Sequence, residues 1–152
     1  MSRAQSIVVR DGRLLMVRHR HRDLAWWCLP GGAIEANESP AEAAIRELQE
    51  ECGVDGVIVG PTSVFMHDCE EHHSFHVDIG NQIPRLGSDP ELSESEQILV
   101  AMDWLGLDVL AERDRVYLWT AGLLGVPGFL GEIERWPSDP SYPTGASSLP
   151  SA

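Results

Sequence analysis

Residues 39–53 constrain the fold most strongly, because they carry a complete set of helix signals. Ser39 suits the N-cap, Pro40 suits the first helical position, and Glu42 completes a capping box with Ser39. Apolar side chains recur at helical spacing and form a stripe: Ala41, Ile45, Leu48 and Cys52. Gly53 is suited to ending the helix. We therefore predict an amphipathic helix over residues 39–52, which must bury its stripe against another layer.

Strand-like segments lie before and after this helix. Residues 6–19 predict a β-hairpin, because two β-rich runs flank the turn pair Asp11-Gly12. Three further runs are predicted as strands: residues 54–66, 72–79 and 98–104. The remaining segments are predicted as helices at residues 107–112 and 116–124, and as loops at residues 19–37 and 82–96. Strands that alternate with helices indicate a mixed α/β fold in a single domain.

The chain length of 152 residues fits one domain, which we assign to residues 1–135. Residues 136–152 are rich in Pro and Ser and carry little charge, so we expect a flexible C-terminal tail. No apolar run approaches the roughly 18–20 residues that a membrane span needs, and no signal segment opens the sequence. The three cysteines have no CxxC spacing, which argues against a disulfide scaffold. We expect a cytoplasmic protein without membrane partners; a homodimer is left open.

The charge is strongly acidic, with 24 acidic against 11 basic residues and a net charge of −13. This balance counts against nucleic acid or anionic lipid as a partner. Arginines gather before residue 24, whereas glutamates gather in residues 35–51. A basic stretch beside an acidic one suits an anionic substrate held through a divalent metal, although solvated faces are the commoner explanation of charge runs.

Three carboxylates lie together on the predicted helix. At 100° per residue, Glu47, Glu50 and Glu51 fall within an arc of about 100°, nearly opposite the apolar stripe. Without a cation they would raise one another's pKa. Mg²⁺ prefers oxygen ligands and would remove this repulsion. The pattern therefore predicts a metal site, with a solvated acidic face as the alternative.

The sequence of residues 32–54 is GAIEANESPAEAAIRELQEECGV. It resembles the signature of the Nudix hydrolases, G-x5-E-x7-R-E-U-x-E-E-x-G-U, where U is a bulky aliphatic residue. Every specified position matches: Gly32, Glu38, Arg46, Glu47, Leu48, Glu50, Glu51, Gly53 and Val54. By chance such a match is expected in about one chain in 10⁷. The resemblance implies a Nudix-type α/β/α sandwich with a mixed β-sheet.

The resemblance also implies the chemistry. Nudix hydrolases split a nucleoside diphosphate linked to another moiety by attack of water on phosphorus, with metal neutralising the phosphates. The implied Mg²⁺ ligands, for which Mn²⁺ could substitute, are Glu47, Glu50, Glu51 and the carbonyl of Gly31. The implied supporting residues of the motif are Gly32, Glu38 and Arg46. The family differs in its general base, so Glu50, Glu47 and the loop residue Glu96 all stay candidates.

Three residues outside the motif are candidates for substrate contacts. Arg18 lies where similar proteins often place an arginine on phosphate, although a solvated strand end is equally plausible. Trp27, or its neighbour Trp26, could stack on a base, although packing is the commoner role of such a residue. His76 lies on the polar face of the strand at residues 72–79, for which a solvated face is the alternative. The His-rich residues 67–76 have zinc-ligand types but fit no compact structural zinc site.

The substrate is left open between nucleoside triphosphates and nucleotide-sugar-like compounds, both small-molecule nucleotides. The alternative from another class is a catalytically silent nucleotide-binding module, but such domains typically lose box glutamates, and this chain keeps them. Removal of pyrophosphate from RNA 5′ ends is disfavoured by the net charge of −13. Isopentenyl diphosphate isomerase shares the fold, but its box departs from this one.

Overall fold

The helix predicted from the capping signals forms as α1, Pro40–Cys52, in the computed structural model, which describes residues 1–88, 92–127 and 129. The Ser39 hydroxyl accepts from the backbone N–H of Glu42, and the Glu42 carboxylate accepts from the N–H of Ser39. Gly53 ends the helix in the left-handed region at φ 65°. The predicted capping box and helix stop are therefore confirmed.

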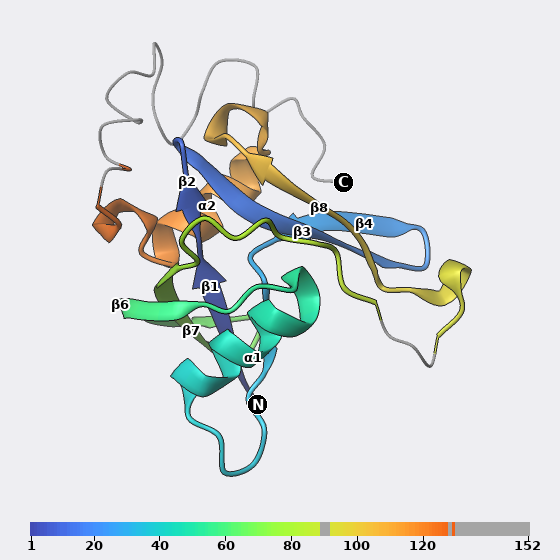
Figure 1. Cartoon of the computed structure of the whole chain (residues 1–152), viewed down its shortest axis with the longest axis horizontal. Coiled ribbons are helices and arrows are strands. Elements are labelled where there is room, and N and C mark those ends of the chain that lie inside the picture. The colour runs from blue at the N-terminus through green and yellow to red at the C-terminus, as the bar shows by residue number, and fades with distance from the viewer. Residues whose placement is uncertain (89–91, 128, 130–152) are drawn as a thin grey trace.

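Two four-stranded sheets form the centre of the molecule (Figure 1). The first sheet, in the order β5-β1-β7-β6, contains β5 (Gly31–Ala33), β1 (Ser2–Ile7), β7 (Glu70–Asp78) and β6 (Val57–His67). It is mixed, because β1 runs parallel to β7 while the other pairs are antiparallel. In the second sheet β3 (Arg13–His21) pairs antiparallel with β2 (Val9–Arg10), β4 (Leu24–Cys28) and β8 (Leu99–Leu105).

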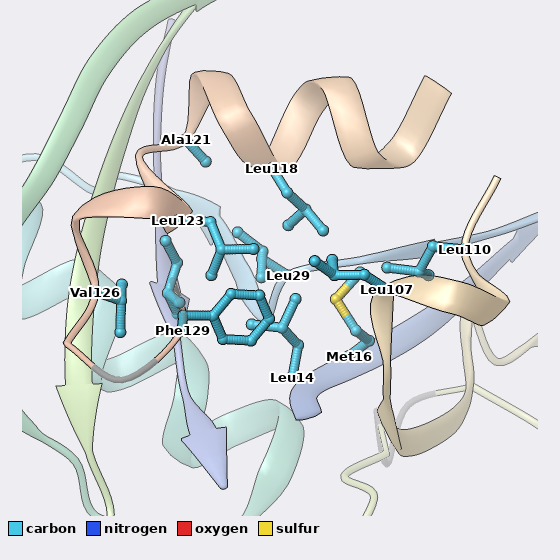
Figure 2. Close-up of a cluster of buried hydrophobic side chains, with 11 residues drawn as sticks. Leu14, Met16, Leu29, Leu107, Leu110, Leu118, Ala121, Leu123, Val126 and Phe129 are labelled. Carbon is cyan, nitrogen blue, oxygen red and sulfur yellow. The ribbon is translucent and has the colours of Figure 1, made fainter. Parts of the chain in front are cut away.

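Helices cover the sheets on both sides. The alternation along β3 divides its side chains between two cores. Leu15 and Val17 pack with Leu48 of α1. Leu14 and Met16 pack with Leu118 of α2 (Glu112–Thr120) in the cluster of Figure 2. The α/β/α sandwich is confirmed, with an antiparallel sheet beside the mixed one.

Three short 3₁₀ turns complete the described elements: η1 (Glu94–Glu96), η2 (Leu107–Val109) and η3 (Leu123–Gly125). The helix predicted over residues 107–112 is only η2, and α2 begins four residues earlier than the helix predicted from residue 116. The predicted strand over residues 54–66 begins later, at Val57. The tail predicted at residues 136–152 lies outside the described residues. Among the described residues, no helix has the length and apolar character needed to cross a bilayer.

Two of the hairpin turns contain pairs of residues with positive φ. Asp11 and Gly12 have φ of 52° and 72° and connect β2 to β3, as the Asp-Gly pair predicts. Asp68 and Cys69, with φ of 48° and 65°, form the tip between β6 and β7.

The loop predicted over residues 19–37 is wrong for much of its length, because it contains the end of β3 and all of β4 and β5. Trp26 and Trp27 pair with β3 as a strand. Gly31 and Gly32, which the sequence marks as breakers, pair with β1 instead. A Cβ at Gly31 would lie 2.3 Å from the carbonyl oxygen of Ala4, so glycine is required here by close packing.

Candidate active site

Two of the three carboxylates of α1, Glu47 and Glu51, lie against the backbone of β5, and the third, Glu50, contacts Arg46. Glu51 Oε1 accepts from the backbone N–H of Gly31 at 2.7 Å, and its Oε2 lies 3.2 Å from His19 Nε2. Glu47 Oε1 and Glu50 Oε2 accept from Arg46 Nη1 at 2.9 and 3.3 Å. The Glu50 side chain is 56% exposed, whereas those of Glu47 and Glu51 are only 16% and 13% exposed. Glu50 is thus the one carboxylate of the three that is open to water.

Arg46 connects this helix to the preceding loop. Its Nε and Nη2 donate to the two carboxylate oxygens of Glu38 at 2.7 and 3.0 Å, a bidentate pair. Nη2 also donates to the carbonyl of Ala33 at 3.0 Å. The hydrogen bond from Arg46 lowers the pKa of Glu38, and the backbone N–H of Glu35 contributes. The supporting role expected of Glu38 and Arg46 therefore has a geometric basis.

Gly32 lets the β5 backbone approach Glu47 closely. A Cβ at Gly32 would lie 2.4 Å from Glu47 Oε1, which no real contact tolerates. Burial raises the pKa of Glu47, and the charges of Glu51 and Glu50 add to that rise against the opposing effect of Arg46. A carboxylate in this position favours a cation beside it.

The donor chemistry of the site fits a hard divalent cation. The four candidate donors are all oxygen: the carboxylates of Glu47, Glu50 and Glu51 and the carbonyl of Gly31. In the part of the chain that the structure describes, no set of three or more His, Cys, Asp or Glu side chains is already arranged to hold a metal. The carboxylates are directed instead at Arg46 and His19. Binding of a cation here requires them to turn toward a common point.

His19 contacts one of these carboxylates and is not among the residues predicted from the sequence. It lies on β3, and its ring is 5.9 Å from that of Trp26. Burial acts to lower the pKa of His19, but hydrogen bonds to Cys28 and Glu51 outweigh it and raise the pKa to about 9. His19 Nε2 and Glu51 Oε2 thus form a close pair at 3.2 Å. No signal in the sequence pairs His19 with a residue 32 positions away.

A cleft of about 670 Å³ has His19, the partner of Glu51, in its wall, whereas Glu47, Glu50 and Glu51 are not among its lining residues. Its lining comes from β1, β3, β4, the tip of the β6–β7 hairpin and α2. The aromatic and cationic lining residues include Arg3, Trp26, Trp27, His72, Arg113 and Tyr117. Trp27, a predicted substrate contact, lines this cleft.

A buried chain of hydrogen bonds forms the floor between β1, β7 and α2. Gln5 Nε2 donates to Ser74 Oγ at 2.8 Å, and the Tyr117 hydroxyl donates to Gln5 Oε1 at 2.6 Å. The same Tyr117 oxygen lies 2.8 Å from His72 Nδ1. The solvated face considered for residues 72–79 is therefore wrong in its first half, because His72 and Ser74 are buried.

Three predicted site residues lie elsewhere. Arg18 has its guanidinium 5.9 Å from the Trp27 ring but is not part of the cleft lining, and its buried Nε has no hydrogen-bond partner among the residues that the structure describes. His76 lies further along β7 and does not line the cleft either. Glu96 caps η1, where it accepts from the N–H and hydroxyl of Ser93 at 3.0 and 2.6 Å. Figure 1 shows η1 well apart from α1.

The His-rich segment is divided between different contacts. His67 and His72 pack edge-on at 5.4 Å, whereas His73 pairs with Glu71 at 2.6 Å. In the described part of the chain these side chains do not gather into a zinc site.

The NUDIX domain model matches residues 2–121. The chain belongs to the NUDIX family. It is 35% identical over 146 residues to the CMP-5'-(N-acetyl-N-hydroxy-3-aminopropyl)phosphonate hydrolase of Streptomyces rubellomurinus, a match that covers 87% of this chain and 67% of that protein. It is 32% identical over 113 residues to a MutT-like protein of Streptomyces ambofaciens, with 74% and 68% covered.

A solved structure supports the same assignment. The MutT NUDIX hydrolase from Burkholderia pseudomallei superposes with a TM-score of 0.59 at 25% identity, covering 78% of this chain and 95% of that one. Several other curated relatives are matched over less than half of their own length. As a Nudix hydrolase, the protein acts on pyrophosphate bonds in derivatives of nucleoside diphosphates.

Proposed function

We propose that the protein is a Mg²⁺-dependent enzyme that hydrolyses a nucleoside diphosphate linked to another moiety, a nucleoside triphosphate or a nucleotide-sugar-like compound. The observation that carries the proposal is the set of three carboxylates on one face of α1. Glu47 and Glu51 lie against the Gly31-Gly32 backbone, and Glu51 pairs with His19 in the wall of the cleft. The relative that acts on a CMP-linked phosphonate supports a nucleotide joined to a second acidic group.

Glu47, Glu50, Glu51 and the carbonyl of Gly31 would hold the metal. When bound, Mg²⁺ would neutralise charge on the phosphate oxygens. Arg46 keeps its bidentate pair with Glu38, so the loop before α1 stays in place while the glutamates turn to the cation.

Glu50 is our candidate for the base that takes a proton from the attacking water. Its carboxylate is more than half exposed, and its one hydrogen bond to Arg46 is long at 3.3 Å. Glu47 is the second candidate, because burial raises its pKa toward the range of a general base. Glu96 is the third, and would need a movement of η1 to reach the site.

Arg3 is our candidate for contact with the phosphates, in place of Arg18. It is paired in the sheet with Ala33 on β5 and with His72 on β7. Arg3 therefore lies between β5, which contacts the carboxylates of α1, and the β7 side of the cleft. Trp27, with Trp26, is proposed to pack on the nucleoside.

The test is hydrolysis of a panel of nucleoside triphosphates, nucleotide sugars and CMP-linked phosphonates, with Mg²⁺ and with EDTA. We expect Mg²⁺-dependent cleavage of the anhydride, with two acidic products seen by phosphorus NMR. Binding without cleavage of any compound would favour the silent nucleotide-binding module instead.

The base is identified by rescue. Glu47→Gln, Glu50→Gln and Glu51→Gln should all fold, and a variant that lacks only a metal ligand should recover with excess Mg²⁺ or Mn²⁺. A variant that lacks the base should not recover, because base strength is then missing. Gln49→Ala, an exposed change on the same helix, is the control. If excess metal rescues all three of these variants while Glu96→Gln stays inactive, the general base is Glu96 on η1.

A further inference from the structure

On the β7 side of the cleft, the hydrogen bond between Tyr117 and His72 decides which ring nitrogen of His72 can accept a hydrogen bond from a ligand. The Tyr117 hydroxyl donates its proton to Gln5 Oε1, so its oxygen can only accept from His72. His72 Nδ1, 2.8 Å from that oxygen, therefore carries the proton. In the neutral imidazole the other nitrogen, Nε2, is then an acceptor.

Packing holds the His72 ring in this orientation. Its centroid lies 5.3 Å from the ring of Phe65, 5.4 Å from His67 and 5.9 Å from Tyr117. The residue is only 6% exposed, yet it lines the cleft. Burial lowers the pKa of His72, which keeps the ring neutral at neutral pH.

A second acceptor lies beside it. Glu70 Oε2 is 3.9 Å from His72 Nε2, and Glu70 also lines the cleft. Of the two guanidinium groups in the lining, Arg113 donates to Asp114 at 3.3 Å, and Arg3 donates to the carbonyl of Leu29 at 3.5 Å and has further N–H donors for the phosphates. His72 Nε2 and Glu70 Oε2 are thus two neighbouring acceptors in the cleft lining.

Two neighbouring acceptors are best satisfied by one group with two N–H bonds. The amino group of a cytosine or adenine base has this form. The imide N–H of uracil could reach only one acceptor, and its flanking carbonyls would face the carboxylate of Glu70. Trp26 and Trp27 add aromatic surface on which a flat base can pack.

We propose that His72 and Glu70 form a base-recognition subsite that selects amino-bearing nucleobases, cytosine and adenine, over their oxo counterparts. The proposal rests on the proposed function in taking the substrate to be a nucleotide. Tyr117 acts as a positioning residue, because its hydroxyl sets which nitrogen of His72 accepts.

The test measures the binding of matched mononucleotides in the absence of metal, with tryptophan fluorescence or calorimetry as the readout. CMP and UMP differ only in the amino and oxo edge, as do AMP and IMP. We expect the wild type to bind CMP about tenfold more tightly than UMP, the value of one well-formed hydrogen bond. The same preference should appear in kcat/KM for CMP-linked against UMP-linked substrates.

Two variants isolate the subsite. His72→Phe keeps a ring of similar size without the acceptor, and the CMP/UMP ratio should fall to about one. Glu70→Gln changes an exposed side chain, so the protein should still fold. The new amide can donate to a carbonyl of uracil, so the preference for CMP over UMP in binding affinity should decrease. His73→Phe, on the same strand but outside the cleft lining, should keep the wild-type ratio.

Equal affinity for CMP and UMP in the wild type, or an unchanged ratio in both His72→Phe and Glu70→Gln, would overturn the subsite. Because mononucleotide binding is measured without turnover, a failure of hydrolysis would overturn the proposed function separately.

Discussion

Gly32 is the residue at which the β5 backbone approaches the proposed metal site most closely. Gly32→Ala would place a Cβ 2.4 Å from Glu47 Oε1, so the carboxylate must move away. Because the clash is with the end of a flexible side chain, the fold should survive. A displacement of about 1 Å at a catalytic group can cost about 10²-fold, so if Glu47 acts as proposed we expect a loss of activity of that order.

The control for this change is Gly60→Ala, where an added Cβ meets nothing within 4 Å. It should keep wild-type turnover. Full activity in Gly32→Ala, measured on a substrate from the panel, would show that Glu47 is not held against β5 for catalysis.

For individual residues of the candidate site, the sequence predicts the carboxylates but not the side chains that contact them. Glu47, Glu50 and Glu51 are found because helical periodicity alone puts them on one face. His19 and Tyr117 are not found, because each acts through a partner far along the chain: Glu51 at 32 positions and Gln5 at 112. No local pattern encodes such contacts.

The helix α1 is the element that joins the core to the site. Leu48 is fully buried on the face opposite the glutamates and packs with β3 and β7. Leu48→Ala should lower the free energy of unfolding by about 2–5 kcal/mol, because it leaves a cavity. Urea unfolding measures this value.

The matched control is Leu124→Ala, which removes a half-exposed leucine from η3. Its cost should be much smaller. Equal losses in the two variants would contradict the role given to the apolar stripe of α1.

Elements with strong local signals are predicted well, and those made by pairing are not. The capping box and Gly53 define α1 within the sequence itself. β5 contains two glycines in three residues, so its strand character comes only from pairing with β1. The mixed sheet implied by the resemblance is present, and the antiparallel sheet around β3 lies beside it.

The stability of the whole molecule should depend on the proton of His72. Burial is the main cause that lowers its pKa. The charged and titratable groups that face it are Arg3, His67, Asp68, Glu70 and Tyr117. The unfolded chain therefore binds this proton at a higher pH than the folded protein does, and stability falls as pH falls.

Neutral His72 contributes fully to the free energy of unfolding above about pH 6.5, the ordinary pKa of histidine. This contribution is lost as the pH falls through the lower pKa of His72 in the folded protein. Wild-type protein should therefore lose more unfolding free energy than His72→Gln between about pH 7.5 and about pH 5.5. Urea unfolding at several pH values measures the difference. Parallel curves for the two proteins would contradict a lowered pKa.

The central claim is that the carboxylate face of α1 holds a divalent metal. Mn²⁺ reports this directly, because its electron paramagnetic resonance signal is strong when free and is lost on binding. We predict that the wild type and Gln49→Ala lower the signal of free Mn²⁺. The triple variant, in which Glu47, Glu50 and Glu51 are all replaced by glutamine, should fold but leave this signal unchanged. Equal depletion by the triple variant and the wild type would place the metal elsewhere and contradict the account.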